Sequence, residues 1–313
     1  MFSRRLLRIK VLQILYGYHK AEGKTYVQSE KELIFSINKS YELYHYLMLL
    51  LIEVADHARS RMEIARQKKM PTYEDLNPNT RFIDNRFIHQ LEENPDLTRM
   101  VETKKLSWTD DREIIRGLYE LISESEIFHA YMSDEASGYN EDKKFVLKVL
   151  SEIIYNYEGL YNLLEEKSIF WVDDIDFIIQ MIVKTLRKFN EHKISQLLPM
   201  FKDKEDLEFV TKLLRKSILH AEDNNKLIEV SAKNWELDRI AFIDILIMQM
   251  AITEAIEFQS IPIKVTMNEY IEISKVFSTK KSSQFINGIL DNVFNNLKKE
   301  KKINKTGRGL IGD

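Results

Sequence analysis

The sequence of 313 residues contains no cysteine, so disulfide bonds, thiolate zinc sites and cysteine nucleophiles are excluded. Only nine glycines and five prolines interrupt it, and so few turn-forming residues indicate a mostly helical protein. The longest strongly apolar run, residues 46–52, is far shorter than the roughly 20 residues of a membrane-spanning helix. The N-terminus has no apolar stretch of the secretory kind. We therefore expect a cytoplasmic protein that makes no membrane contact.

Signatures of catalysis are scarce as well. The sequence contains no Walker motif and no nucleophile elbow, so no enzyme class has a positive signal, and we expect a protein that is not an enzyme. Residues 307–312 match G-x-G-x-x-G, but a dinucleotide site needs a preceding strand and a following helix, and only Asp313 follows. We interpret the match as part of a polar, basic tail at residues 301–313, which we expect to be disordered.

Two E-x-x-H sequences resemble part of a metal site. Glu42/His45 and Glu126/His129 each place a carboxylate and an imidazole on one face of a predicted helix, as di-iron four-helix bundles require. Such bundles also need a glutamate from each of two further helices, and no partner glutamate can be singled out. Because seven histidines among 49 acidic residues produce this spacing by chance, we expect surface or boundary histidines, and no metal or other cofactor.

Positive charge is concentrated at the two ends of the chain. Residues 1–24 carry a net charge of +5 and residues 275–313 a net charge of +6, which leaves −14 for residues 25–274. If folding brings the ends together, this asymmetry predicts a polyanionic partner there. A solvated basic tail combined with chance would give the same count.

Residues 2–18 form an amphipathic helical pattern with arginines in an unusual place. Arg4 and Arg8 line up with Val11 and Leu15 on the apolar arc. Burying an unpaired arginine is costly, so we expect the first two turns to project beyond the bundle as a surface that binds phosphates. Tyr16, at the edge of the arc, can offer its ring to a base. In the alternative, the arginines pair with the acidic middle of the chain and Tyr16 is a boundary residue of the core.

Helical patterns follow one another along the rest of the chain, and the C-terminal third is the most regular part. Residues 235–258 have too many apolar side chains for a surface helix and predict a central, nearly surrounded one. A further helix begins near Val265, and the last one follows a polar loop in which Ser278 or Ser282 is the expected N-cap.

Both ends of the chain resemble the NusB family of bacterial transcription antitermination factors. The residues that carry the resemblance are RRLLRIKVLQILYGY (4–18), EDLEFVTKLLRKSI (205–218), WELDRIAFID (235–244), IPIKVTMNEYIEISKVFS (261–278) and KSSQFINGILD (281–291). The last of these matches the family pattern S-x-x-F-V-N-G-V-L-D almost position by position. The likeness covers residues 1–38 and 200–300.

The resemblance implies an all-α fold, a NusB-like helical bundle core, and a role as an RNA-binding adaptor in transcription regulation. Members of the family bind boxA-type RNA together with NusE, a small-subunit ribosomal protein, within the RNA polymerase antitermination complex of ribosomal RNA operons. The implied RNA-binding residues are Arg4, Arg5, Arg8, Gln13, Tyr16, Lys280, Lys281, Ser282 and Phe285. Asn287, Gly288 and Asp291 are expected to fix the last helix, with Gly288 allowing close approach.

The chain also departs from the family pattern. Gln249 and Thr253 stand where the family often has arginine and tyrosine, and Lys281 replaces an acidic residue that is common in the turn. The largest departure is a helical insertion at residues 39–199, whose acidic balance argues against an added RNA-binding surface and favours a protein-contact or packing module.

Two alternatives to the RNA-binding factor remain open. One is a helical protein-interaction scaffold in which the insertion has taken over and the RNA surface is vestigial. The other is an RNA methyltransferase with a NusB-like N-terminal domain, which is disfavoured because no glycine-rich cofactor domain follows Leu297.

Overall fold

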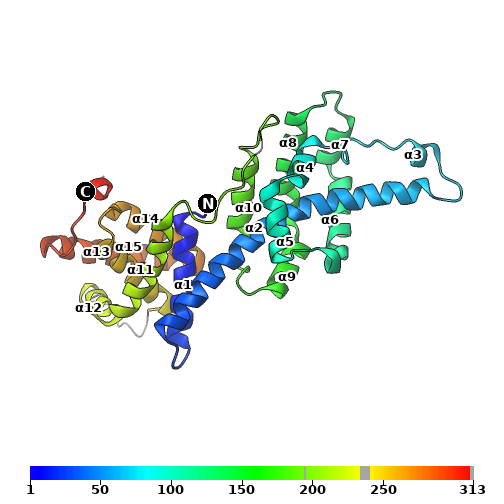
Figure 1. Ribbon diagram of the computed structural model, residues 1–313. Coiled ribbons are helices and arrows are strands. Elements are labelled where there is room, and N and C mark those ends of the chain that lie inside the picture. The colour runs from blue at the N-terminus through cyan, green and yellow to red at the C-terminus, as the bar shows by residue number, and fades with distance from the viewer. Residues whose placement is uncertain (194, 233–239, 311–313) are drawn as a thin grey trace. The chain divides into compact units, whose positions relative to one another are not determined.

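Figure 1 shows the chain as a computed structural model built from helices. The structure describes residues 1–193, 195–232 and 240–310, and within these ranges it contains no strand. The all-α fold predicted from composition is therefore confirmed.

Two compact units share the helices. We name them the terminal unit, which comprises Phe2–Ile37 and Phe201–Asp313, and the inserted unit, which comprises Asn38–Met200 together with Met1. The long helix α2 (Tyr26–Arg66) begins in the terminal unit and continues into the inserted unit. The other elements of the terminal unit are α1 (Arg4–Lys20), α11 (Lys204–Leu219), α12 (Ala221–Ser231), α13 (Phe242–Glu257), α14 (Ile263–Phe277), α15 (Lys280–Lys299) and the 3₁₀ turn η5 (Gly307–Leu310).

The terminal unit packs around α13. Eleven of the sixteen residues of this helix are buried, and it contacts α1, α11, α12, α14 and α15. A helix with apolar residues on every side has no face to give to water, so it is covered by neighbours. The prediction of a nearly surrounded central helix is confirmed for Phe242–Glu257, while residues 235–239 of the predicted stretch lie outside the described part of the chain.

The last helix begins with a different cap from the one predicted. Thr279 is the N-cap of α15, because its side-chain oxygen accepts a hydrogen bond from the backbone N–H of Ser282 at 3.2 Å. Ser278 instead ends α14, with its N–H bonded to the Ser274 carbonyl. The hydroxyls at 278, 279 and 282 are equivalent in sequence, and the length of α14 decides which of them caps.

The expectation of a disordered tail is wrong for residues 301–310. The N–H of Thr306 donates to the Gln259 carbonyl at 3.0 Å, and Lys305 Nζ donates to the Phe258 carbonyl at 3.0 Å. Gly309 is buried, and a Cβ built on it would lie 1.9 Å from the same Gln259 oxygen. Residues 305–309 therefore pack against the end of α13 and the turn after it.

The inserted unit has its own core of aromatic and aliphatic side chains. Its elements are the rest of α2, α3 (Tyr73–Leu76), α4 (Arg86–Glu92), α5 (Pro95–Lys104), η1 (Thr109–Asp111), α6 (Arg112–Glu124), α7 (Glu126–Ser133), α8 (Tyr139–Lys148), the π-helical turn η2 (Val149–Ile153), η3 (Ile154–Asn156), α9 (Glu158–Lys167) and α10 (Ile175–Leu186). The rings of Tyr46 and Trp108 stack at 4.0 Å, and the indole N–H of Trp108 donates to the Tyr46 carbonyl at 3.0 Å.

A buried polar network ties α4, α7 and α8 together in the same unit. Asp142 accepts from the Tyr131 hydroxyl at 2.7 Å and from the backbone N–H of Arg86 at 2.9 Å. Asn85 donates to the Tyr131 oxygen at 3.0 Å while its own side-chain oxygen caps α4. Because each member has a partner, the network can be buried without leaving a polar group exposed to an apolar core.

Candidate nucleic-acid interface

Helix α1 carries the arginines and runs antiparallel to α13. Ser3 caps its N-terminus by accepting from the Leu6 N–H at 3.2 Å. Arg8 meets Glu254 near the C-terminal end of α13, whereas the ring of Tyr16 lies 5.6 Å from Phe242 at its N-terminal end. The arginines and Tyr16 therefore lie at opposite ends of the terminal unit's central helix.

Arg8 forms a buried ion pair in the interior of the terminal unit. Its Nε and Nη2 each donate to a different oxygen of Glu254 at 2.7 Å, and the side chains are 2% and 0% exposed. Thr266 and Tyr270 also donate to this carboxylate, at 2.8 and 3.1 Å. Burial disfavours the charged guanidinium, but the Glu254 charge and its hydrogen bonds outweigh that cost and raise the pKa of Arg8.

The predicted overhang of the first two turns is therefore wrong. Arg8 is out of reach of a phosphate in solvent, and Lys10 is only 1% exposed. The cost of burying a guanidinium is met by Glu254, which is 246 positions away in the sequence and has no signal that marks it as the partner. The alternative, in which arginines pair with the acidic middle of the chain, describes Arg8 correctly.

Arg4 and Arg5 are paired too, but they keep part of their surface. Arg5 donates from Nε and Nη2 to Glu269 at 3.0 and 2.9 Å, and Arg4 donates from Nε to Asp206 at 3.1 Å. The side chains of the two arginines are 39% and 38% exposed. The hydrogen bond to Glu269 raises the pKa of Arg5. A phosphate can approach these guanidinium groups only beside a carboxylate that already uses them.

The other end of α1 presents an aromatic and cationic surface. Tyr16 is 42% exposed, and Lys20 Nζ lies 5.8 Å from its ring and 4.5 Å from the ring of Phe242. His19 packs edge-on against Phe242, and burial lowers the pKa of this histidine. Gln13, one turn before Tyr16, is half-buried. Sequence reasoning named Tyr16 and Gln13 but missed Lys20, although lysine four residues after a tyrosine lies on the same helical face.

The start of α15 lies toward this same end. Helices α13 and α14 pack as an antiparallel pair, since Thr266 and Tyr270 of the first half of α14 meet Glu254 of the last turn of α13. A two-residue turn then leads from the end of α14 into α15, and from this connection we infer that the first turn of α15 lies toward the N-terminal end of α13. There, Lys281 is exposed and Ser282 and Phe285 are half-buried, while the side chain of Lys280 lies outside the described part of the structure.

The expected single patch of arginines and lysines from both termini is accordingly divided. Arg5 and Tyr16 are eleven residues apart, which corresponds to roughly 16 Å along a helix axis. The residues that share one end are Gln13, Tyr16 and Lys20 of α1 with Lys281, Ser282 and Phe285 of α15, and we name this set the α1/α15 surface. The half-exposed Arg4 and Arg5 lie toward the other end.

Asn287, Gly288 and Asp291 do not hold α15 against its neighbours. All three are exposed, and a Cβ added to Gly288 would meet no heavy atom within 4 Å. Asp291 accepts only a long hydrogen bond, 3.3 Å, from the side chain of Asn295 among the interactions of the described residues. The prediction that they fix the helix is wrong, and they instead extend the exposed polar face of α15 that begins at Lys281.

Neither E-x-x-H sequence assembles a metal site. Glu42 pairs with Lys39 and with Lys104 at 2.6 and 3.2 Å, and Nδ1 of His45 lies 2.7 Å from the Tyr41 carbonyl. Within the described ranges, no group of three or more metal-ligating side chains comes together.

Among the described helices, none combines the length and the apolar character needed to cross a membrane.

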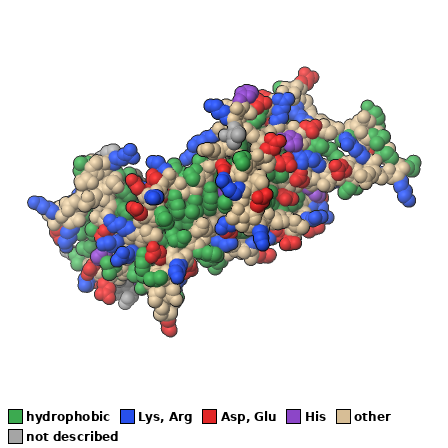
Figure 2. All heavy atoms as spheres, viewed as in Figure 1, with side chains coloured by type: hydrophobic (Ala, Val, Ile, Leu, Met, Phe, Trp, Pro, Cys, Tyr) green, Lys and Arg blue, Asp and Glu red, His purple; other side chains and the backbone are tan. Residues whose placement is uncertain are grey.

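Positive and negative side chains are mixed on the face of the molecule that Figure 2 draws. On the face drawn in Figure 2, lysine and arginine lie between aspartate and glutamate rather than in one large field of a single sign. Local geometry, and not the net charge of a segment, therefore decides where a polyanion can be held.

Comparison with known proteins identifies relatives of this chain. The model of the NusB family matches residues 175–295. The transcription antitermination protein NusB of Salinibacter ruber is 41% identical over 114 residues, which is 36% of this chain and 71% of the relative. That of Chloroherpeton thalassium is 43% identical over 104 residues, 33% of this chain and 49% of the relative.

NusB of Symbiobacterium thermophilum is 36% identical over 96 residues, 31% of this chain and 63% of the relative. No solved structure matches the chain.

Proposed function

The chain belongs to the NusB family, and from this premise we propose that it is a transcription antitermination factor that binds boxA-type single-stranded RNA together with NusE. Membership of the family is the observation that carries the proposal, because the relatives are named transcription antitermination proteins. The proposed role needs no catalytic group, only a surface that recognises RNA and one that recognises the ribosomal protein.

The α1/α15 surface supports the RNA part of the proposal. Lys20 and Lys281 provide charge for phosphates, and the exposed ring of Tyr16 provides a stacking face for an unpaired base. Arg4 and Arg5 remain candidates for phosphate contacts at the margin, and Arg8 acts in our revised proposal by holding α1 against α13. Lys281, which replaces a residue that is often acidic in the family, adds to the attraction.

The direct test is a titration of full-length protein with a labelled boxA-type RNA, with and without NusE. We expect Tyr16→Ala combined with Lys281→Ala to weaken binding about 10-fold or more, since one stacked base contributes about 1–3 kcal/mol. Lys226→Ala on α12 is the matched control, because Lys226 is an exposed cation of the same unit whose ion pair, within the described residues, is with Asp223 of its own helix. Equal RNA affinity of wild type, the Tyr16→Ala/Lys281→Ala variant and the Lys226→Ala control would exclude the α1/α15 surface as the RNA-binding site.

A helical scaffold without RNA binding is the second candidate, because the inserted unit forms a compact body with its own core. Capture of the ribosomal protein by a chain that does not bind RNA at any accessible salt concentration would favour it.

A further inference from the structure

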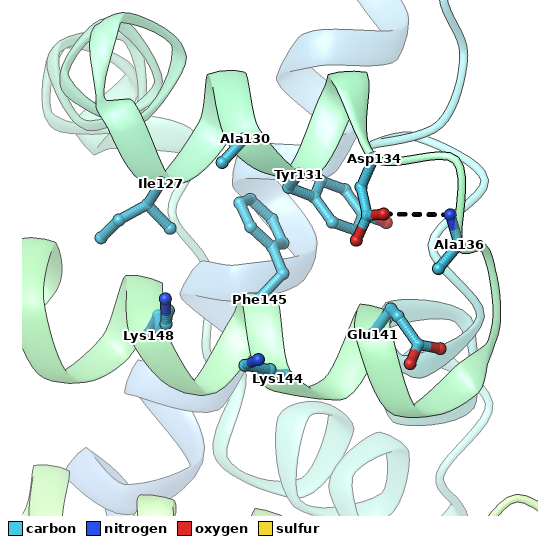
Figure 3. A pocket seen from close by; sticks show the side chains of 9 residues that line it. All are labelled: Ile127, Ala130, Tyr131, Asp134, Ala136, Glu141, Lys144, Phe145 and Lys148. Atoms are coloured by element: carbon cyan, nitrogen blue, oxygen red, sulfur yellow. Dashed lines mark hydrogen bonds between the residues drawn. The ribbon is translucent and has the colours of Figure 1, made fainter.

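A second positively charged surface lies in the inserted unit, along α8 and α10. Lys144 and Lys148 are exposed on α8, and Ser151 and Tyr155 follow in the turns η2 and η3. Figure 3 shows the two lysines on one helix, at the edge of a small pocket that α8 forms with α7.

Helix α10 contributes the other side of this surface. Lys184, Arg187 and Lys188 are exposed near its C-terminal end. Lys143 fixes α8 beside that end, because its Nζ donates to the carbonyls of Arg187 and Phe189, both at 2.8 Å. Three cations at the end of α10 and two on α8 therefore lie on helices that two hydrogen bonds of Lys143 hold side by side.

A groove of about 650 Å³ lies between α10 and the turns η2 and η3 that follow α8. Its lining combines the apolar side chains of Ile179 and Val183 with the half-buried ring of Tyr155 and with Ser151. The cations Lys184, Arg187 and Lys188 line the same groove. We name this feature the inserted-unit groove.

The five cations are not neutralised by the protein. Within the described part of the chain, none of Lys144, Lys148, Lys184, Arg187 and Lys188 forms an ion pair. The carboxylates nearest in sequence are Asp142, which is bonded within its own network, and Glu191, which lies 3.6 Å from Arg86. Asp176 of α10 accepts from the Tyr161 hydroxyl at 2.8 Å and also forms a hydrogen bond with Tyr155, which leaves the ring faces of Tyr155 as the part that can stack. The groove thus has an excess of positive charge within a unit whose sequence holds more acidic than basic residues.

We propose that the inserted-unit groove is a second binding site for single-stranded RNA, with Lys184, Arg187 and Lys188 on phosphates and Tyr155 as a stacking face. Lys144 and Lys148 line the separate pocket between α7 and α8 and add positive charge nearby. This inference rests on the proposed function, because it assigns the site to RNA that the terminal unit also binds. It contradicts our sequence-based expectation that the acidic insertion adds no RNA contact.

The make-up of the groove favours RNA over an acidic peptide. A single strand presents phosphates at regular intervals along its backbone and flat bases beside them, and proteins hold such strands with a charged groove that contains aromatic rings. An acidic peptide would use the cations but not the ring or the apolar floor. Binding of a peptide is accordingly an outcome of the test and not part of the proposal.

The test compares full-length wild type with Lys184→Ala/Arg187→Ala/Lys188→Ala. The matched control is Arg66→Ala/Lys68→Ala/Lys69→Ala, which removes three exposed cations from the end of α2 in the same unit. The probes are two labelled boxA-type RNAs, a short one of about 12 nucleotides and a long one of about 30, with anisotropy measured over a range of salt. Thermal melting checks that both variants fold.

We expect the groove variant to bind the long RNA about 10-fold more weakly and to lower its salt slope by about 2, since each lost phosphate contact on a single strand removes about 0.7. Binding of the short RNA should not change. Ultraviolet cross-linking of the long RNA should label the peptide that contains Tyr155 in wild type. Equal losses in the groove and control variants would overturn the proposal, as would tight binding of poly-glutamate through the groove without any RNA binding.

A failure of the proposed function gives a different result from a failure of the inserted-unit groove. If the short RNA does not bind wild type and Tyr16→Ala/Lys281→Ala has no effect, the α1/α15 surface is wrong. The groove variant still reports on the long RNA in that case.

Discussion

In the terminal unit, the arginines of α1 point at carboxylates of α11, α13 and α14, and one of them is fully enclosed with its partner. In the inserted unit, exposed cations of α8 and α10 have no such partner within the described residues, although that segment is the acidic part of the chain. In the terminal unit the arginines of α1 form ion pairs with carboxylates of the neighbouring helices. In the inserted unit several exposed cations have no ion pair with a described residue. Net charge of a segment is thus a poor guide to where a polyanion binds.

The buried pair gives the largest expected effect. Glu254→Ala leaves the Arg8 guanidinium, the Thr266 hydroxyl and the Tyr270 hydroxyl without their acceptor, so we expect a loss of about 3–5 kcal/mol in the free energy of unfolding. Glu269→Ala breaks the half-exposed pair with Arg5 and a longer contact of 3.8 Å with Arg8, and it should cost about 1 kcal/mol or less because Arg8 keeps both hydrogen bonds to Glu254. Urea unfolding of both variants measures the difference, and similar losses would break the comparison between buried and exposed pairs.

The docked tail comes next in size. Gly309→Ala places a methyl group against the Gln259 carbonyl, and we expect the free energy of unfolding to fall by about 1–3 kcal/mol. Gly288→Ala is the matched control within the same unit, because its Cβ meets open space in a helix, where alanine is favoured over glycine by about 0.5–1 kcal/mol. A stable Gly309→Ala variant would mean that residues 301–310 do not pack as described.

Releasing a paired arginine sharpens the comparison on the binding side. Glu269→Gln removes the negative charge that pairs with Arg5. We therefore expect the affinity for boxA-type RNA to rise about 2- to 5-fold, which corresponds to the free energy that one exposed ion pair usually contributes. The increase should disappear at high salt. An unchanged or weaker affinity at low salt would place Arg5 away from the path of the RNA.

The smallest effect concerns pH in the inserted unit. Burial lowers the pKa of His45, against the opposing hydrogen bond to the Tyr41 carbonyl, so the unfolded state binds a proton before the folded state does. Stability from this residue is therefore present above the unfolded pKa of about 6.5 and is lost as the pH falls toward the lowered folded value. Urea unfolding at pH 7 and pH 5 should show a smaller drop for His45→Phe than for wild type; an equal drop would contradict the assignment.

Helix periodicity made the class of the fold and its central helix predictable. The apolar residues of 242–257 occupy every side of a helix, which only a surrounded position explains. The motif at 281–291 identified the family in the same way, because it is a local pattern. The loop that holds the N-cap of α15 was predictable from the sequence, but the capping residue was not. Its identity depends on where α14 ends, which the sequence does not mark.

The candidate site was predictable only in part. Tyr16 and Lys281 were named from the sequence and both are exposed, whereas Arg8 was named as a surface residue and is buried. The difference lies in the partner: an arginine on an apolar arc is tolerated in a core if a distant carboxylate meets it, and no local pattern reveals that carboxylate. Lys20 and the inserted-unit groove were missed because their neighbours come from other helices.

By itself the sequence determined what depends on neighbours in the chain: helical class, the apolar faces, and the short motifs of the NusB family. Tertiary structure alone decided which charged side chains form ion pairs within the protein and which stay exposed for a binding partner. Ion pairing depends on distances between residues hundreds of positions apart, as between Arg8 and Glu254 at 2.7 Å, and the energy of a charge changes with its burial. That is why Arg8 of an arginine-rich helix became part of the interior and an acidic insertion acquired an exposed basic groove.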